Sequence, residues 1–404
     1  MKQIKVLLVA NVAKGHVNKF HIPTIKYLKS KGWHIDVACS LDEDIPFADN
    51  VYGMSWKRSP FTFKTLKGIV ELYQLLKKNQ YDIIYCHTPV GGLVARFASI
   101  PFRKHGLKVV YFAHGLHFFK GSSILSWLLF YPMEKLMAEF TDMFITINDE
   151  DYERVKKKFN RHMLVSKTNG IGANFNRLDI KNPEKIRQEY RNKLHIPIRS
   201  KILIYVAEIN NNKNQQMLIK VLKNLRSKNL DVYLLLVGPD YLNGRCQQLS
   251  AKLQVQEYTK FLGWRNDIGE LLSASDIYVA SSKREGLAIN LVEAQYAHLP
   301  VVATSNRGHL AVIKNNENGI LVPIDDYSSM ADQITTLMEN PDLYKKMANV
   351  DVSKYESVKV ASEIYECLYD VLTYIIHSGF ISGYQNRYGD NLKPPTNVYH
   401  RMTA

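Results

Sequence analysis

The chain has 404 residues, of which 46% are hydrophobic and 23% are charged. This balance excludes an intrinsically disordered chain, and the length exceeds what one hydrophobic core usually supports, so two domains are expected. The four cysteines form no C-x-x-C pair, which excludes a zinc site built from cysteines and is typical of a reducing compartment.

Positive charge is concentrated in the N-terminal part of the chain. The formal net charge is +15, and residues 1–180 hold 26 Lys and Arg against 15 Asp and Glu. Such a surface suits an anionic partner, namely lipid headgroups, a phosphorylated substrate or nucleic acid, or it is simply a soluble surface rich in lysine. Nucleic acid is disfavoured because no arginine-rich stripe, zinc motif or RNA-binding aromatic run accompanies the charge.

Strand and helix patterns alternate through the first 150 residues. The apolar run at 4–10 is too short to span a bilayer and is followed by no signal-peptide cleavage site, so it predicts a buried first strand. The other expected strands are 34–39, 81–87, 107–115 and 142–148, and the expected helices are 20–32 and 65–79. Repeated βα units with continuous apolar strands predict a parallel sheet covered on both faces.

The pattern lapses at 170–200 and then starts again. The second series of apolar segments is 201–207, 231–238, 258–263, 268–280, 299–305 and 319–323, with helices near 214–228 and 243–254. The sequence therefore predicts two Rossmann-like domains. We place them at 1–178 and 179–355, with 356–404 as a helix that returns to the first domain plus a tail.

Ligands of open α/β sheets bind beyond the carboxyl ends of the strands, so the residues after each strand are candidates for a site. Gly15 follows the first strand and would let the backbone approach a phosphate, although the dinucleotide fingerprint is absent and a plain turn is the alternative. His114 directly follows the largely apolar residues 108–113 ("KVVYFA"), where it either faces a ligand or is structural. Lys213 follows "EINNN" and suits a diphosphate, unless it is an ordinary solvated lysine.

The segment "SSKREGLAINLVEA" at 281–294 carries the strongest signal. We expect Gly286 to open a helix, so that the N–H groups of residues 286–288 (Gly286, Leu287 and Ala288) face a bound anion. In a continuous helix Glu285 and Glu293 would be about 12 Å apart, beyond the roughly 5 to 9.5 Å between glycosidase carboxylates, so hydrolysis by this pair is disfavoured. Glu285 is better placed near a transferred group, and Glu293 suits the two hydroxyls of a ribose. The alternative is that both glutamates are surface residues.

These residues resemble a known family. The spacing of Glu285 and Glu293 in "REGLAINLVEA" is similar to the E-x7-E motif of retaining GT-B glycosyltransferases of family four. Residues 111–152 resemble the capsule and exopolysaccharide branch of that family, and "GIGANF" at 170–175 resembles its interdomain segment. The resemblance covers roughly residues 3–375 and implies the GT-B fold, with two Rossmann-like parallel-sheet domains facing across a cleft.

The resemblance also implies an activity and a set of roles. The activity is metal-independent transfer of a sugar with retention, from a UDP-hexose or UDP-N-acetylhexosamine and with no cofactor. By likeness, Glu293 holds the ribose, Glu285 holds the sugar and Lys213 neutralises the diphosphate. The resemblance also implies that the backbone groups of Gly286, Leu287 and Ala288 contact the donor. Uracil is expected near Arg265 and Asn266, the reacting sugar beside His114, and the β-phosphate at Gly15.

One position departs from the family pattern. Glu208 stands where the family commonly has an arginine on the diphosphate, which removes a cation from the leaving group. Our hypothesis is that Lys283 or Arg284 supplies the positive charge that Glu208 does not. The segment "GIG" also continues as Ala173-Asn174 rather than as valine-aspartate.

The acceptor implied by the resemblance is a saccharide on a polyprenyl diphosphate, at the cytoplasmic face of the cell membrane. Residues 116–132 gather aromatic residues and leucines beside Lys120, and this segment is either an interfacial contact with anionic lipid or a core helix. The acidic runs at 42–44 and 148–151 match a metal-binding D-x-D motif only superficially. Alternative functions are a nucleotide-sugar epimerase, a phosphorylase or a catalytically silent binding protein.

Overall fold

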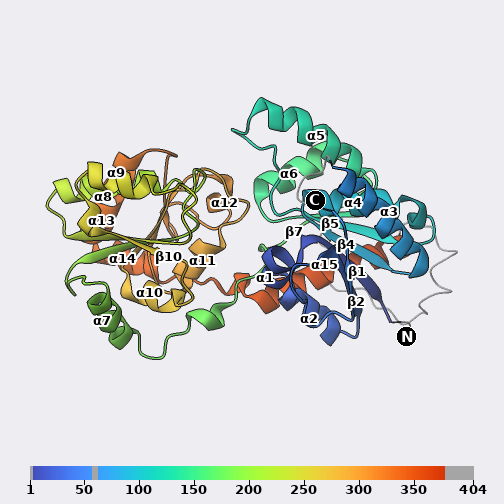
Figure 1. The fold of residues 1–404 in the computed structure, drawn as a ribbon, viewed down its shortest axis with the longest axis horizontal. Coiled ribbons are helices and arrows are strands. Elements are labelled where there is room, and N and C mark those ends of the chain that lie inside the picture. The colour runs from blue at the N-terminus through green and yellow to red at the C-terminus, as the bar shows by residue number, and fades with distance from the viewer. Residues whose placement is uncertain (1–2, 57–61, 378–404) are drawn as a thin grey trace. The chain divides into compact units, whose positions relative to one another are not determined.

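The computed structural model describes residues 3–56 and 62–377, which form two compact units (Figure 1). Unit 1 is built from Met1–Ile171 together with the chain from Ser357, and unit 2 is Gly172–Glu356. Residues 172–178, which the sequence boundary places in the first domain, lie in unit 2, where Phe175 and Leu178 are buried in its core. The expected tail at 378–404 lies outside the described residues.

Unit 1 contains a parallel sheet. Within the described residues the strand order is β3-β2-β1-β4-β5-β6-β7, and every neighbouring pair is parallel. The strands are β1 (Lys5–Val12), β2 (His34–Ser40), β3 (Asn50–Gly53), β4 (Ile83–His87), β5 (Lys108–Phe112), β6 (Met143–Thr146) and β7 (Leu164–Lys167). The central strands are buried on both faces, which is why their sequences are continuous apolar runs.

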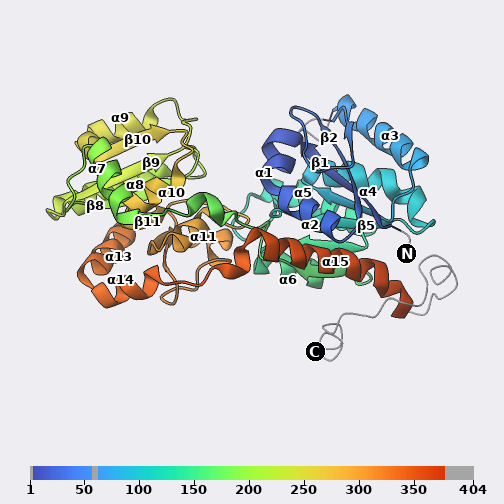
Figure 2. The same cartoon turned by 90° about the horizontal axis from the view of Figure 1, so that it is seen from below.

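Helices cover both faces of this sheet. The helices are α1 (Asn18–Phe20), α2 (Ile22–Ser30), α3 (Phe63–Lys78), α4 (Pro89–Arg103), α5 (Ile124–Ala138), α6 (Asp149–Lys158) and α15 (Ser357–His377), and a π-helical turn (Ala13–Val17) follows β1. Helices α3 and α4 pack side by side on one face, while α2 and α15 pack side by side on the other (Figure 2).

The C-terminal helix α15 is part of unit 1. The Tyr27 hydroxyl on α2 donates a 2.9 Å hydrogen bond to Ser362 Oγ on α15, and the rings of Trp33 and Tyr365 have their centroids 5.2 Å apart. Glu363 accepts a 2.9 Å hydrogen bond from the backbone N–H of Asn169, just before the chain enters unit 2. Unit 1 is therefore assembled from both ends of the described chain.

Unit 2 contains a second parallel sheet, with the order β10-β9-β8-β11-β12-β13 in the part of the chain that is described. The strands are β8 (Lys201–Val206), β9 (Val232–Val237), β10 (Thr259–Gly263), β11 (Ile277–Ala280), β12 (Val301–Thr304) and β13 (Ile320–Val322). The helices are α7 (Pro183–Lys193), α8 (Gln215–Ser227), α9 (Arg245–Lys252), α10 (Ile268–Ala274), α11 (Ile289–Tyr296), α12 (Arg307–Leu310), α13 (Tyr327–Glu339) and α14 (Pro341–Ala348), with 3-10 turns at Phe175–Leu178, Gln256–Tyr258 and Ser353–Tyr355.

The prediction of two parallel α/β domains is confirmed. The sequence missed β3 and β7, which are four-residue strands at the two edges of the sheet in unit 1. Their side chains are mostly half-buried or exposed, so neither strand carries the long apolar run that marks the central strands. Among the described residues, no helix is both long and apolar enough to cross a bilayer.

Candidate active site

The loop after β11 holds Glu285, and it is fixed by the neighbouring strand β12. Ser282 is fully buried, and its carbonyl oxygen accepts hydrogen bonds from Thr304 Oγ1 at 2.6 Å and from Asn306 Nδ2 at 2.9 Å. Thr304 ends β12, and Asn306 caps the short helix that follows it. The carboxyl ends of two adjacent strands therefore hold the loop in one conformation.

Glu285 forms an ion pair with Lys213, which lies beyond the end of β8. Lys213 Nζ is 2.5 Å from Glu285 Oε1, and Ser282 Oγ donates a 2.6 Å hydrogen bond to the same oxygen. The Tyr205 hydroxyl donates in turn to Ser282 Oγ at 2.6 Å. The structure thus brings together the two residues that the sequence singled out after β8 and β11, and a buried hydroxyl chain orients the carboxylate.

Lys213 is presented by a turn that asparagines hold. Asn210 Oδ1 accepts hydrogen bonds from the backbone N–H groups of Asn212 at 3.0 Å and of Lys213 at 2.9 Å. Asn214 has a φ of 56°, the left-handed conformation that asparagine tolerates, and α8 starts immediately after it. The asparagines therefore fix the backbone that carries Lys213.

Residues 306–309, which the sequence analysis did not single out, complete the surroundings of Glu285. Arg307 Nε donates to the Glu285 carbonyl at 3.3 Å, and a Cβ built on Gly308 would lie 2.4 Å from Glu285 Cβ. The imidazole of His309 is fully buried and donates from Nδ1 to the Thr304 carbonyl at 2.6 Å. Burial lowers the pKa of His309 to about 4. The strand-end rule applied after β12 would have found this segment.

The expected start of the helix at Gly286 is wrong. Helix α11 begins at Ile289, and Gly286, Leu287 and Ala288 belong to the loop. The N–H of Ala288 is already hydrogen-bonded to the Gly308 carbonyl at 3.4 Å. The contact with the segment after β12 therefore fixes this loop outside the helix, and its three N–H groups do not form the first turn of a helix.

Glu293 lies on the buried side of α11, where it pairs with an arginine that the sequence analysis did not consider. Its carboxylate Oε1 receives the guanidinium Nη2 of Arg177, which projects from the 3-10 turn Phe175–Leu178. The ring of Phe175 in that turn stacks on Tyr296 at the end of α11, with centroids 4.2 Å apart. The stacking fixes the turn against α11 and so places Arg177 beside Glu293.

Arg265 and Asn266 lie in an exposed segment after β10, at the same edge of the sheet as Lys213 and Glu285. Arg265 donates to Asp267 Oδ1 at 2.7 Å, and this hydrogen bond lowers the pKa of Asp267 to about 2. Glu208 is also exposed, just after β8. Lys283 forms a 3.2 Å ion pair with Asp325 at the surface.

Gly15 and His114 lie at the carboxyl edge of the sheet in unit 1. Gly15 is exposed within the π-helical turn after β1, and His114 follows β5. His114 Nε2 is 3.4 Å from Nδ1 of His87, the last residue of β4, which the sequence analysis did not single out. Burial lowers the pKa of both imidazoles well below the ordinary histidine value, so both are neutral near pH 7.

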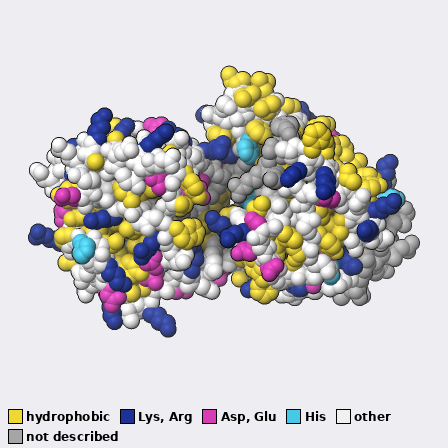
Figure 3. Space-filling view, viewed as in Figure 1, with side chains coloured by type: hydrophobic (Ala, Val, Ile, Leu, Met, Phe, Trp, Pro, Cys, Tyr) yellow, Lys and Arg dark blue, Asp and Glu magenta, His cyan; other side chains and the backbone are white. Residues whose placement is uncertain are grey.

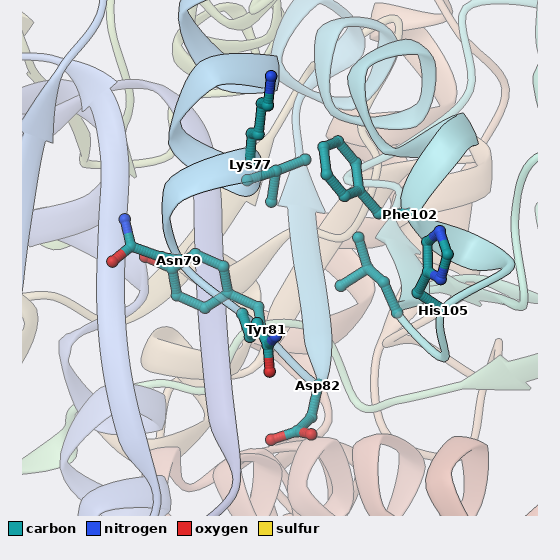
Figure 4. A pocket seen from close by; sticks show the side chains of 9 residues that line it. Lys77, Asn79, Tyr81, Asp82, Phe102 and His105 are labelled. Atoms are coloured by element: carbon teal, nitrogen blue, oxygen red, sulfur yellow. The ribbon is translucent and has the colours of Figure 1, made fainter. Parts of the chain in front are cut away.

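A pocket of about 200 Å³ lies at the opposite edge of the sheet in unit 1 (Figure 4). Lys77 and Asn79 line it at the end of α3, Tyr81 and Asp82 lie just before β4, and His105 follows α4. Ligands of open parallel sheets bind at the carboxyl ends of the strands, whereas this pocket is at the amino ends. We therefore do not assign it to the active site.

Comparisons with known proteins identify the family of this chain. The family model described as "Glycosyl transferases group 1" matches residues 186–350, and the model "Glycosyl transferase 4-like" matches residues 5–148. A protein of Bacillus subtilis (strain 168) assigned to the glycosyltransferases and named EpsD is 37% identical over 375 residues, covering 91% of this chain and 98% of that protein.

Two further similarities concern a more distant relative and the fold. The UDP-Gal:alpha-D-GlcNAc-diphosphoundecaprenol alpha-1,3-galactosyltransferase of Escherichia coli is 27% identical over 323 residues, covering 76% of this chain and 80% of that protein. The crystal structure of Anabaena Alr3699/HepE in complex with UDP and glucose superposes with a TM-score of 0.74 at 20% identity, covering 91% of this chain and all of that one. This chain has the GT-B fold and belongs to the group 1 glycosyltransferases.

Proposed function

We propose that the protein transfers a hexose or N-acetylhexosamine from a UDP-sugar to a saccharide carried on a polyprenyl diphosphate, in the synthesis of a capsule- or exopolysaccharide-type polymer. The observation that carries this proposal is the ion pair of Lys213 and Glu285, because it places an ammonium and a carboxylate together at the ligand-binding edge of unit 2. The UDP complex of the structural neighbour supports the donor, and the name of the Escherichia coli relative supports the acceptor.

The proposed reaction keeps the configuration of the anomeric carbon. The acceptor hydroxyl oxygen bonds to that carbon on the face from which the diphosphate leaves, the sugar–phosphate bond breaks, and the hydroxyl proton passes to the leaving diphosphate oxygen. Negative charge grows on the diphosphate during this step, and the fixed ammonium of Lys213 stabilises it in place of a metal ion. When the donor binds, before this step, Glu285 exchanges its contact with Lys213 for hydroxyls of the donor sugar.

The other donor contacts are assigned from their places in the fold. Glu293 accepts the ribose hydroxyls when its contact with Arg177 opens, and Arg265 with Asn266 contacts uracil beyond β10. The loop at 286–288 (Gly286, Leu287 and Ala288) lies against the donor as a loop before α11 rather than as a helix start. In unit 1, His114 is assigned to the reacting sugar and Gly15 to the β-phosphate.

Donor binding is tested by thermal shift with UDP, GDP and several UDP-sugars. A ligand at 100 times its Kd stabilises its domain by about 2.7 kcal/mol, so UDP compounds should raise the Tm of the unit 2 transition. Glu293→Gln should remove that shift, whereas Glu339→Gln, an exposed glutamate on α13, should leave it intact. If no nucleotide shifts the wild type, the donor assignment fails and a catalytically silent protein replaces it.

Product analysis tests the reaction itself. Incubation with a UDP-sugar and a polyprenyl-diphosphate saccharide should give a product whose new anomeric configuration, measured by NMR coupling constants, equals that of the donor. An inverted product would contradict the retaining step. Conversion of the UDP-sugar to its epimer without acceptor would identify an epimerase, and phosphate-dependent release of a sugar phosphate would identify a phosphorylase.

We also propose that helix α5 docks on an anionic membrane surface at the cytoplasmic face. Ile124 is 79% exposed and Leu128 is 68% exposed, and Leu125 and Leu129 are exposed beside them. Figure 3 shows these hydrophobic side chains gathered over α5. The other side of α5 carries Trp127, whose indole contacts Phe118 with ring centroids 5.6 Å apart. One side of α5 therefore packs against the core, and the other side is an exposed apolar surface. This helix lies in the part of the chain that carries most of the net positive charge, which attracts anionic lipid.

Sedimentation with vesicles tests this docking. The wild type should sediment with vesicles that contain anionic lipid, and less so as salt rises, because charge attraction is screened. Leu125→Glu with Leu128→Glu should abolish sedimentation, while Ile198→Glu, an exposed apolar residue of unit 2, should not. Sedimentation of the double variant at the wild-type level would contradict the assignment of α5.

A further inference from the structure

Four histidines from three neighbouring strand ends converge in unit 1. His16 lies in the π-helical turn after β1, His21 joins α1 to α2, His87 ends β4, and His114 follows β5. One ring nitrogen of each can be chosen so that all four lie within 4.8 Å of one another. Strands β1, β4 and β5 are adjacent in the sheet, so the topology brings together residues up to 98 positions apart in the sequence.

Two of the distances within this histidine cluster (His16, His21, His87 and His114) match the spacing of ligands around one metal ion, and all of them are within 4.8 Å. His16 Nε2 is 3.1 Å from His21 Nε2, and His87 Nδ1 is 3.4 Å from His114 Nε2. Nitrogens that bind zinc at about 2.0–2.1 Å in a tetrahedron are roughly 3.4 Å apart. The cluster can surround an ion once side-chain movements bring its widest pair of nitrogens, which is at most 4.8 Å apart, towards that spacing.

Packing alone does not account for the polarity of this cluster. His21 and His87 are 1% and 0% exposed, so two imidazoles of the cluster are removed from water. Burying a polar ring costs free energy unless its nitrogens are bonded, and an apolar side chain would fill the same space without that cost. Imidazole nitrogens are among the ligands that zinc-class ions prefer in proteins.

We propose that His16, His21, His87 and His114 form a binding site for one divalent transition-metal ion of the zinc class. The ion links the ends of β1, β4 and β5, whereas the charge of the donor diphosphate is neutralised by Lys213 in the proposed function. His114 presents Nε2 to the cluster, so an ion bound there leaves the hydrogen on Nδ1. If His114 contacts the donor sugar as proposed above, it does so as a hydrogen-bond donor of fixed tautomer.

Metal binding is measured on the full chain after removal of any affinity tag, because a histidine tag would bind the same ions. The metal-free protein is titrated with Co²⁺ and with Zn²⁺. The expected result is one equivalent of Co²⁺ with the visible spectrum of a tetrahedral complex, displaced by Zn²⁺, and a Tm of the unit 1 transition that rises with Zn²⁺. His114→Gln, at a partly exposed position, should weaken binding by at least tenfold, and His162→Gln, at an exposed position outside the cluster, should not.

A second variant shows whether the cluster contacts the ion directly. His16→Cys replaces one nitrogen ligand by a thiolate, so the Co²⁺ complex should gain a near-ultraviolet thiolate-to-cobalt band. The absence of a stoichiometric Co²⁺ spectrum in the wild type overturns the proposal, as does a His114→Gln variant that binds Co²⁺ like the wild type. UDP binding to unit 2 is measured by thermal shift in the presence of EDTA, independently of the metal titration. Failure of the metal site and failure of the donor site are therefore distinguishable.

Discussion

The backbone of Gly308 lies against the side chain of Glu285, so closely that a methyl group on residue 308 would be 2.4 Å from Glu285 Cβ and 2.7 Å from its carbonyl carbon. No side chain fits there unless one of the two loops moves. The glycine after β12 therefore determines where the carboxylate after β11 is held.

Gly308→Ala tests this relationship. The added methyl should displace Glu285 from Lys213 and destabilise unit 2 by about 1–3 kcal/mol, the usual range for overpacking. Transfer activity should fall more than the folded fraction does at the assay temperature. Activity and urea unfolding are measured on the same preparation. Wild-type values for both would show that the two loops accommodate the methyl group, and would contradict the proposed role of Gly308.

Lys213→Met should lower kcat by about 100-fold to 1,000-fold, the loss typical of removing one group that stabilises a developing anion. The fold should survive, because Lys213 is partly exposed and its neighbour Ser282 still donates to Glu285. Lys223→Met, at an exposed position on the helix that follows Lys213, is the matched control. If Arg284→Met lowers kcat as much as Lys213→Met does, the compensation for Glu208 is supported; wild-type activity in Arg284→Met contradicts it.

A buried ion pair anchors α5. Arg96 Nη1 on α4 is 2.8 Å from Glu134 Oε2 on α5, both side chains are buried, and the guanidinium lies 4.0 Å from the centre of the Tyr111 ring. Glu134→Gln leaves the arginine charge without its counterion and should destabilise unit 1 by about 3–5 kcal/mol. Arg96→Met with Glu134→Leu should recover most of that loss in denaturant unfolding. A double variant less stable than Glu134→Gln would contradict this account.

The buried His309 should make the stability of unit 2 depend on pH. Its pKa is about 4 in the folded protein, against about 6.5 in an unfolded chain, so between these values the unfolded state binds a proton that the folded state does not. Stability is therefore full above about pH 6.5 and falls as the pH drops towards 4. His309→Gln should flatten this dependence, whereas the exposed His162→Gln should not, as denaturant unfolding at pH 7.5, 6 and 5 would show.

Local sequence was sufficient for much of the fold and for part of the site. Central strands such as β1 and β8 are long apolar runs, and the rule that ligands bind after the strands led to Lys213 and Glu285, which the structure brings within 2.5 Å. The sequence did not predict the edge strand β3, because a short strand at the edge of a sheet has no apolar pattern of its own.

The missed features depend on neighbours that are distant in the chain. The start of α11 was predicted too early because the carbonyl of Gly308 accepts a hydrogen bond from the N–H of Ala288. The residues near position 288 in the sequence give no sign of that contact. The histidine cluster was missed for the same reason, because His16 and His87 come together only through the order of the strands in the sheet. Single residues at strand ends are visible in a sequence, whereas their partners follow from topology.

The return of α15 to unit 1 orders events during synthesis of the chain. Unit 2 is one continuous segment and can fold as soon as residue 356 has left the ribosome, whereas the face of unit 1 that carries Tyr27 and Trp33 waits for residues 362–365. The domain that is translated first is thus completed last. Until then, nascent unit 1 presents an uncovered apolar face that chaperones can bind.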